Sequence, residues 1–70
     1  MDFSNESMKS LLSSRELEMI SWLRKGYGRS EISEKMSVSI HTYDGYRRSI
    51  RAKLQIRNQA DWAKVLISDV

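Results

Sequence analysis

Basic side chains are concentrated in one short segment, residues 40–56. The segment holds four basic residues and one acid, the same excess of +3 as the whole 70-residue chain, so the remainder is electrically balanced. The residues are Arg47, Arg48, Arg51, Lys53 and the acid Asp44. A guanidinium group donates hydrogen bonds in a fixed fork that matches phosphates and the acceptor edges of bases. The segment therefore predicts a surface for an anionic partner.

The same segment has the apolar spacing of an amphipathic helix, at about 100° per residue. Its apolar side consists of Tyr43, Tyr46, Ile50 and Leu54. Its polar side consists of His41, Asp44, Arg48 and Arg51. Reading the major groove of DNA requires a helix that is packed down on one face and positive on the other.

Other kinds of chemistry lack the residues they need. The chain has no cysteine and one histidine, His41, which cannot hold a metal ion by itself. No nucleophile–base pair, paired carboxylates or glycine-rich phosphate loop is present, so we expect neither an enzyme nor a cofactor. No segment is long and apolar enough to cross a membrane, and no signal peptide is evident. We expect a cytoplasmic protein with no membrane partner.

The elements that position the basic segment are all predicted to be helices, because no stretch alternates apolar and polar residues as a strand would. The expected helices cover residues 14–25, 29–36, 40–54 and 59–68. Residues 1–10 are polar and without period, and are predicted to form a flexible arm before a single domain at 11–70. The sequence thus predicts an all-α fold.

Capping residues mark where these helices begin. Ser13 and Glu16 form a capping box before the first helix, and Ser39 caps the third. Gly26 is placed to end the first helix as a C′ glycine. The second and third helices are separated only by residues 37–39. A short helix, a tight turn and a longer basic helix are typical of a helix-turn-helix.

A larger set of residues carries a family resemblance over Leu12–Ile67. The matching positions are Leu12, Arg15, Glu16, Glu18, Gly26, Glu31, Ile32, Val38, Ser39, Thr42, Ile50, Lys53, Leu54 and Ile56. At this spacing the chain resembles the LuxR-type DNA-binding domain, also called GerE or FixJ/NarL-type. The resemblance implies a four-helix bundle with a central helix-turn-helix. It also implies that the third helix lies in the major groove and that the fourth makes a dimer contact.

The resemblance, together with the place of each residue on its helix, leads to an expected role for individual positions. The residues expected at base edges are Asp44, Gly45 and Arg48. Those expected at the DNA backbone are Arg29, Ser30, Thr42, Tyr46, Arg47 and Arg51, and His41 is expected near a phosphate. The expected dimer seam consists of Ala63, Val65, Ile67 and Val70. Asp44 departs from the family pattern, since most relatives have Lys or Arg there.

The resulting interpretation is sequence-specific binding of double-stranded DNA by a bacterial transcriptional regulator in the nucleoid. The chain fits both a small regulator and the output domain of a response regulator, acting as a homodimer or as a heterodimer with a related regulator. Trp62 is assigned to the core, with a dimer surface as the alternative. Asp44, Tyr43 and Tyr46 motivate a second hypothesis, in which an impaired helix-turn-helix module binds another regulator or RNA polymerase.

Overall fold

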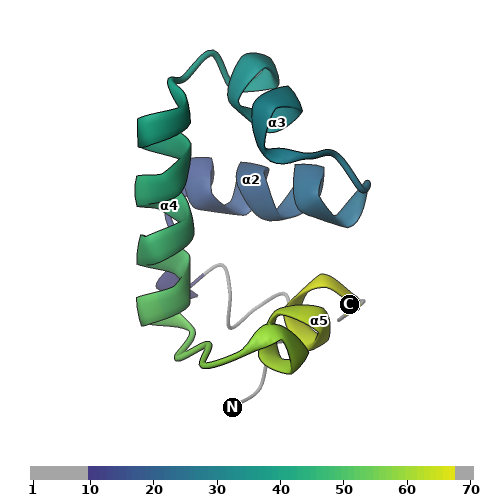
Figure 1. Cartoon of the computed structure of the whole chain (residues 1–70). Coiled ribbons are helices and arrows are strands. Elements are labelled where there is room, and N and C mark those ends of the chain that lie inside the picture. Colours follow the sequence, from purple (N-terminus) through teal and green to yellow (C-terminus); the bar gives the residue numbers. More distant parts are fainter. Residues whose placement is uncertain (1–9, 68–70) are drawn as a thin grey trace.

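The computed structural model describes residues 10–67, and the helices within that range are connected by short turns. The helices are α2 (Ser14–Arg24), α3 (Arg29–Lys35), α4 (Ile40–Lys53) and α5 (Gln59–Ile67) (Figure 1). No strand occurs in the described range, and the predicted all-α fold is confirmed. Of the expected arm, residues 1–9 lie outside the described residues, and Ser10 is helical together with Leu11.

Three of the described helices begin at side-chain caps, and two of these caps, at Ser13 and Ser39, were predicted from the sequence. Ser13 Oγ accepts from the Glu16 backbone N–H at 3.2 Å, and Glu16 Oε1 accepts from the Ser13 N–H at 2.8 Å. This capping box satisfies two amides that have no partner inside α2. Ser39 Oγ accepts from the Thr42 N–H at 3.0 Å in front of α4. Asn58 does the same for α5, accepting from the Asp61 N–H at 3.0 Å.

Three of the described turns contain a residue in a left-handed backbone conformation, at Gly26, Ser37 and Gln55. Gly26 ends α2 with φ of 90°, which an L side chain would resist. Ser37 has φ of 57° in the turn between α3 and α4, where the chain reverses within three residues. The helix-turn-helix is therefore closed by a non-glycine residue in a conformation that glycine adopts more easily.

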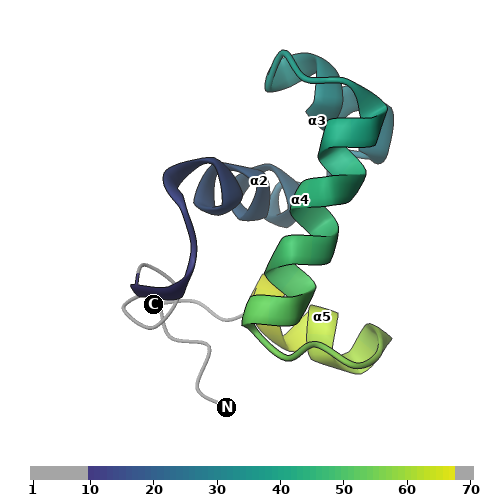
Figure 2. The ribbon, with the colours of Figure 1, turned by 90° about the vertical axis from the view of Figure 1, so that its left-hand side faces the viewer.

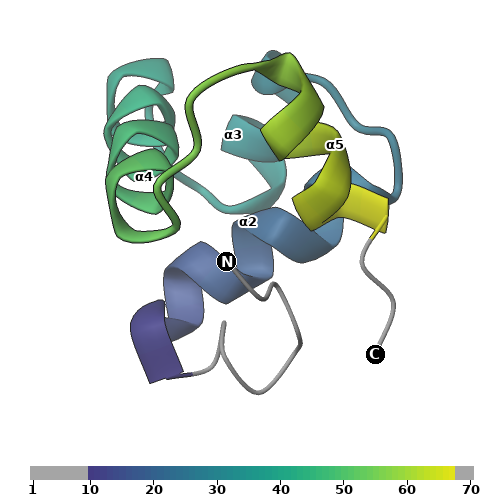
Figure 3. The same cartoon turned by 90° about the horizontal axis from the view of Figure 1, so that it is seen from below.

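The helix α2 is the centre of the packing, because it contacts each of the other three helices. Figure 1 shows α2 running across the middle, with α3 above it, α5 below it and α4 across one end. Seen from below in Figure 3, α5 lies to the right of α4, with α3 behind the two helices. This arrangement holds the two helices of the helix-turn-helix against a common support.

Every helix contributes to one apolar core. The side chains that are almost completely buried are Met19 from α2, Ile32 from α3, Ile50 from α4 and Val65 from α5. Leu54, the C-cap residue of α4, is buried to the same extent. Trp62 is 6% exposed, so its predicted place in the core is confirmed. Burial of a large apolar side chain contributes about 1.5–3 kcal/mol, and this core is the main source of stability in a chain without disulfides.

A buried carboxylate joins the start of α2 to the end of α4. Glu16 is 3% exposed, and its Oε1 accepts from Lys53 Nζ at 2.7 Å. Burial by itself would raise the pKa of Glu16, but hydrogen bonds from Lys53, Ser49 and Ser13 outweigh it and lower that pKa to about 2. The ionised form is thus stabilised by folding.

We expect this carboxylate to make stability depend on acid. Because the pKa of Glu16 is lowered on folding, its contribution is complete above its ordinary value of 4.5 and is lost as the pH falls toward 2. The loss should be on the order of 1–2 kcal/mol, since Lys53 is partly open to solvent. Urea denaturation at a series of pH values measures it. Glu16→Gln should flatten the dependence of the unfolding free energy on pH over this range. Glu34→Gln, at an exposed position, should not. An unchanged pH dependence in Glu16→Gln would contradict this account.

Candidate nucleic-acid interface

The helix α4 carries the basic cluster, and its two sides differ in burial as the spacing predicted. The inward side of α4 is buried: the side chains of Tyr43, Ile50 and the C-cap residue Leu54 are at most 3% exposed. Gly45 and Arg48 on its outward side are exposed. Figure 2 views the molecule from the α4 side, and no other described helix lies in front of it. The outward side of α4 is open to a partner along its length.

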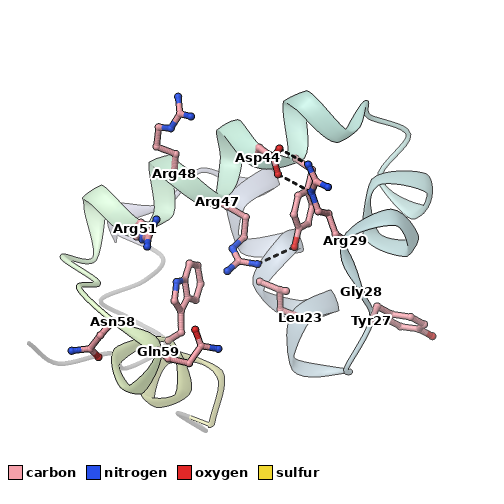
Figure 4. A pocket seen from close by; sticks show the side chains of 12 residues that line it. Leu23, Tyr27, Gly28, Arg29, Asp44, Arg47, Arg48, Arg51, Asn58 and Gln59 are labelled. Atoms are coloured by element: carbon pink, nitrogen blue, oxygen red, sulfur yellow. Dashed lines mark hydrogen bonds and ion pairs between the residues drawn. The ribbon is translucent and has the colours of Figure 1, made fainter.

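Two arginines on this open side have no partner within residues 10–67. Arg48 and Arg51 are exposed, and neither side chain makes a hydrogen bond or an ion pair in the described part of the chain. Figure 4 shows Arg48 extending away from the molecule. Their guanidinium groups keep all five N–H donors and a full charge for an external acceptor.

Arg29 and Asp44 form an ion pair across the helix-turn-helix. Arg29 Nε donates to Asp44 Oδ1 at 3.0 Å, and Arg29 Nη2 donates to Asp44 Oδ2 at 2.7 Å (Figure 4). The guanidinium holds the pKa of the Asp44 carboxyl below its usual value. The sequence analysis placed each residue at the site but missed their pairing, because 15 residues and a turn separate them and no helical spacing rule connects them.

Arg47 corrects one expectation, because its guanidinium turns inward and not toward a phosphate. Arg47 Nη1 donates to Tyr43 Oη at 3.0 Å, and its guanidinium carbon lies 4.3 Å from the centre of the Trp62 ring. A guanidinium is attracted to the negative face of an indole ring, and α5 presents that face beside α4. Arg47 thus ties α4 to α5, and the dashed line at Arg47 in Figure 4 marks this hydrogen bond.

The other residues expected at the DNA backbone are placed unevenly. Ser30, His41 and Thr42 are exposed near the turn side of the helix-turn-helix, and Thr42 Oγ1 accepts from Ser39 Oγ at 3.1 Å. Tyr46 is half-buried and packs against the core. The pKa of Arg15 is raised, with interaction with Tyr46 as its largest cause, so the Tyr46 hydroxyl lies close to Arg15 on α2.

A groove of about 570 Å³ lies between α4, the start of α5 and the turn before α3. Four arginines and one acid line it, which makes its electrostatic character positive. These are Arg29, Arg47, Arg48, Arg51 and Asp44. Asn58 and Gln59 at the start of α5 also line the groove (Figure 4), although the sequence analysis did not assign them to the site.

Gly45 leaves a flat place on the outward side of α4. A Cβ built at this position would meet nothing within 4 Å, so packing inside the domain does not call for glycine. Glycine in a helix interior costs about 0.5–1 kcal/mol relative to alanine. The missing side chain lets a partner approach the helix backbone closely beside Arg48.

The comparison with known families agrees with this geometry. Residues 10–66 match the family model described as bacterial regulatory proteins of the luxR family. The chain belongs to the luxR family of bacterial regulatory proteins. This confirms the resemblance drawn from the sequence, and membership supports a DNA-binding regulatory role. No solved structure matches the chain.

Similar proteins of the luxR family carry a regulatory name. The chain is 35% identical to the oxygen regulatory protein NreC of Staphylococcus haemolyticus (strain JCSC1435) over 60 residues, which is 86% of this chain and 28% of that protein. It is 39% identical to NreC of Staphylococcus carnosus (strain TM300) over 51 residues, which is 73% of this chain and 24% of that protein. The chain thus spans about a quarter of the length of these relatives.

The dimer seam expected for this luxR-family chain needs one correction. Val65 is completely buried, because α5 turns it into the core against α2, so it cannot form an exposed seam. Ala63 is exposed, and Ile67 has 77% of its surface exposed. Val70 lies outside the described residues.

Within residues 10–67, no helix is long and apolar enough to cross a membrane.

Proposed function

We propose that this chain binds double-stranded DNA with α4 in the major groove and acts as a transcriptional regulator in the bacterial nucleoid. The observation that carries the proposal is the open side of α4, where the side chains of Arg48 and Arg51 have no partner within residues 10–67 and follow Gly45, a position without a side chain. Free guanidinium groups on an accessible helix match both base edges and phosphates.

The roles within the proposed interface follow from position along α4. Arg48 and Gly45 would face base edges, since they lie on the exposed side in the first half and middle of the helix. Arg51 lies a turn farther on and would contact the DNA backbone, as would the exposed groups before and at the start of α4. These are Ser30, His41 and Thr42.

A second copy of the chain would extend the contact to two half-sites. A single small module buries a modest area on DNA, so tight binding benefits from a pair. The exposed Ile67 and Ala63 on α5 support a contact between copies through this helix. The names of the relatives, which are regulatory proteins, support a regulatory role for the bound pair.

Salt dependence tests the proposal directly. Fluorescence anisotropy of a labelled random-sequence duplex, titrated with the protein at several salt concentrations, should show affinity that falls steeply with salt. For two or more neutralised phosphates, the slope of log K on log salt should be about −2 or steeper. Arg51→Ala should make this slope shallower by about 1, because one phosphate contact is lost. Lys25→Ala, which removes a charge that does not line the groove, should leave it unchanged.

Two results would contradict DNA binding. Absence of binding to the duplex at low salt would favour a protein partner such as another regulator or RNA polymerase. Equal binding of duplex and single strand would indicate a general attraction to polyanions, with no groove involved. A steep slope together with a preference for the duplex supports the proposal.

A further inference from the structure

Simple charge attraction to DNA does not explain the ion pair between Arg29 and Asp44. Its side chains remain 57% and 45% exposed, and exposed ion pairs contribute little to stability. The acid also removes positive charge from a surface that otherwise attracts DNA. A role in recognition would account for its presence at the groove.

The geometry of the pair leaves a defined set of donors free. Asp44 occupies the Nε–H of Arg29 and one N–H of Nη2. A guanidinium has five N–H groups, so both N–H groups of Nη1 and the second of Nη2 remain without a partner in the described part of the chain. One N–H from each Nη nitrogen points away from Nε, so the two form a parallel pair at the far edge of the guanidinium.

The pair is also electrically balanced, which argues against a phosphate as its target. A guanidinium neutralised by its own carboxylate gains little from counterion release, because the carboxylate repels the same phosphate. Because the ion pair as a whole carries no net charge, its two parallel N–H groups match an uncharged acceptor edge. In the major groove, that edge is O6 and N7 of guanine, which present two acceptors side by side.

We propose that Arg29 reads a guanine through its outer N–H pair, with Asp44 acting as the positioning residue that holds the guanidinium in that orientation. The inference rests on the proposed DNA binding and deepens it. It assigns Arg29, which follows the N-cap of α3, to base recognition and not to the DNA backbone. It also gives the unusual acid of α4 a function that does not require it to touch a base.

Holding the side chain in advance makes base reading more selective. An arginine on the protein surface has several rotatable bonds, and binding must restrict them. The two bonds to Asp44 join the first residue of α3 to the fifth of α4, so the orientation of the guanidinium is set by two helices whose packing is fixed by the core. The flat place at Gly45, next to Asp44 in the chain, leaves room for a base edge to approach.

Selection from a random duplex pool, followed by sequencing of the bound fraction, tests the inference. The wild-type protein should enrich a guanine at one position beyond that assigned to Arg48, with about 5- to 150-fold discrimination against other bases. Arg29→Ala and Asp44→Ala should both relax that position, and the double variant should relax it no further, because the two residues act as one unit. Asp44→Ala should at the same time bind random DNA more tightly, since it removes a negative charge.

Matched variants separate positioning from charge. Arg29→Lys keeps the positive charge but cannot make two bonds to the acid and two to the base, so it should lose the guanine preference. Asp44→Glu keeps the carboxylate and should retain part of it. Both residues are exposed, and thermal unfolding followed by circular dichroism should show that all these variants fold.

Several outcomes would overturn the inference. If Arg29→Ala weakens binding to all sequences equally and makes the salt slope shallower by about 1, Arg29 contacts a phosphate. If Asp44→Ala leaves every base preference unchanged, or alters a position different from that altered by Arg29→Ala, the acid does not position the arginine. Absence of DNA binding by the wild-type protein would instead refute the proposed function, and this inference with it.

Discussion

Replacing Trp62 by alanine is expected to lower the free energy of unfolding by about 3–5 kcal/mol, the range for loss of a large buried aromatic side chain. Trp62 is 6% exposed and packs from α5 into the common core. It also provides the ring on which the Arg47 guanidinium rests at 4.3 Å. A single core in a chain of this size rarely supplies more than about 3–5 kcal/mol in total. We therefore expect most Trp62→Ala molecules to be unfolded at room temperature.

Urea denaturation followed by the helical circular dichroism signal measures this effect. Trp62→Phe keeps an apolar ring and should lose less stability than the alanine variant. Lys64→Ala provides the matched control on the same helix, because Lys64 is exposed, and the change should stay within about 0.5 kcal/mol. A small loss in Trp62→Ala would mean that α5 does not contribute to the core as the structure has it.

Replacing Arg48 by alanine is expected to weaken binding to the preferred DNA site by about 1–3 kcal/mol and to relax one base position. The side chain extends from the open side of α4 and has no partner in the described residues, so its fork is free for the O6 and N7 edge of a guanine (Figure 4). Competition binding with duplexes changed one base pair at a time measures both effects. Because Arg48 is exposed, the substitution should leave unfolding almost unchanged.

Two further variants distinguish base reading from simple charge. Arg48→Lys retains the charge and should keep affinity for random DNA while losing part of the discrimination. Lys25→Ala removes one positive charge next to the Trp22 ring, outside the groove, and should leave discrimination unchanged. An equal loss in Arg48→Ala on all sequences would assign Arg48 to the DNA backbone.

Arg47 shows how neighbouring arginines on one helix take different roles. Arg47 and Arg48 are adjacent in sequence, but a helix turns by about 100° between them. Arg47 therefore faces α5 and is held by Tyr43 and Trp62, whereas Arg48 faces outward. The Nε of Arg47 is buried without a hydrogen-bond partner. The attraction of its guanidinium to the indole ring helps to offset the free-energy cost of burying this donor. This placement makes Arg47 a link between the recognition helix and α5.

Local patterns were sufficient to predict the helices. The capping residues Ser13, Ser39 and Asn58 each act on the amide three residues away, and the apolar spacing of α4 depends only on the helix period. The expected ends of α2, α3 and α4 each include the C-cap residue, one position beyond the helix as the structure has it. The turn at Gly26 was likewise evident from residue type, and its φ of 90° agrees.

Some arginines of the site are bonded inside the domain and others are free to bind a partner. This difference depends on distances between residues of different helices, which only tertiary packing sets. The amino-acid sequence alone was enough to predict an all-α chain of the luxR family with a basic, half-buried helix, because short-range spacing carries each of those features. It did not determine that Arg29 meets Asp44, that Arg47 meets Trp62, or that Val65 is buried. These contacts depend on how the helices lie relative to one another. That arrangement is set in part by α2, because each of the other described helices packs against it.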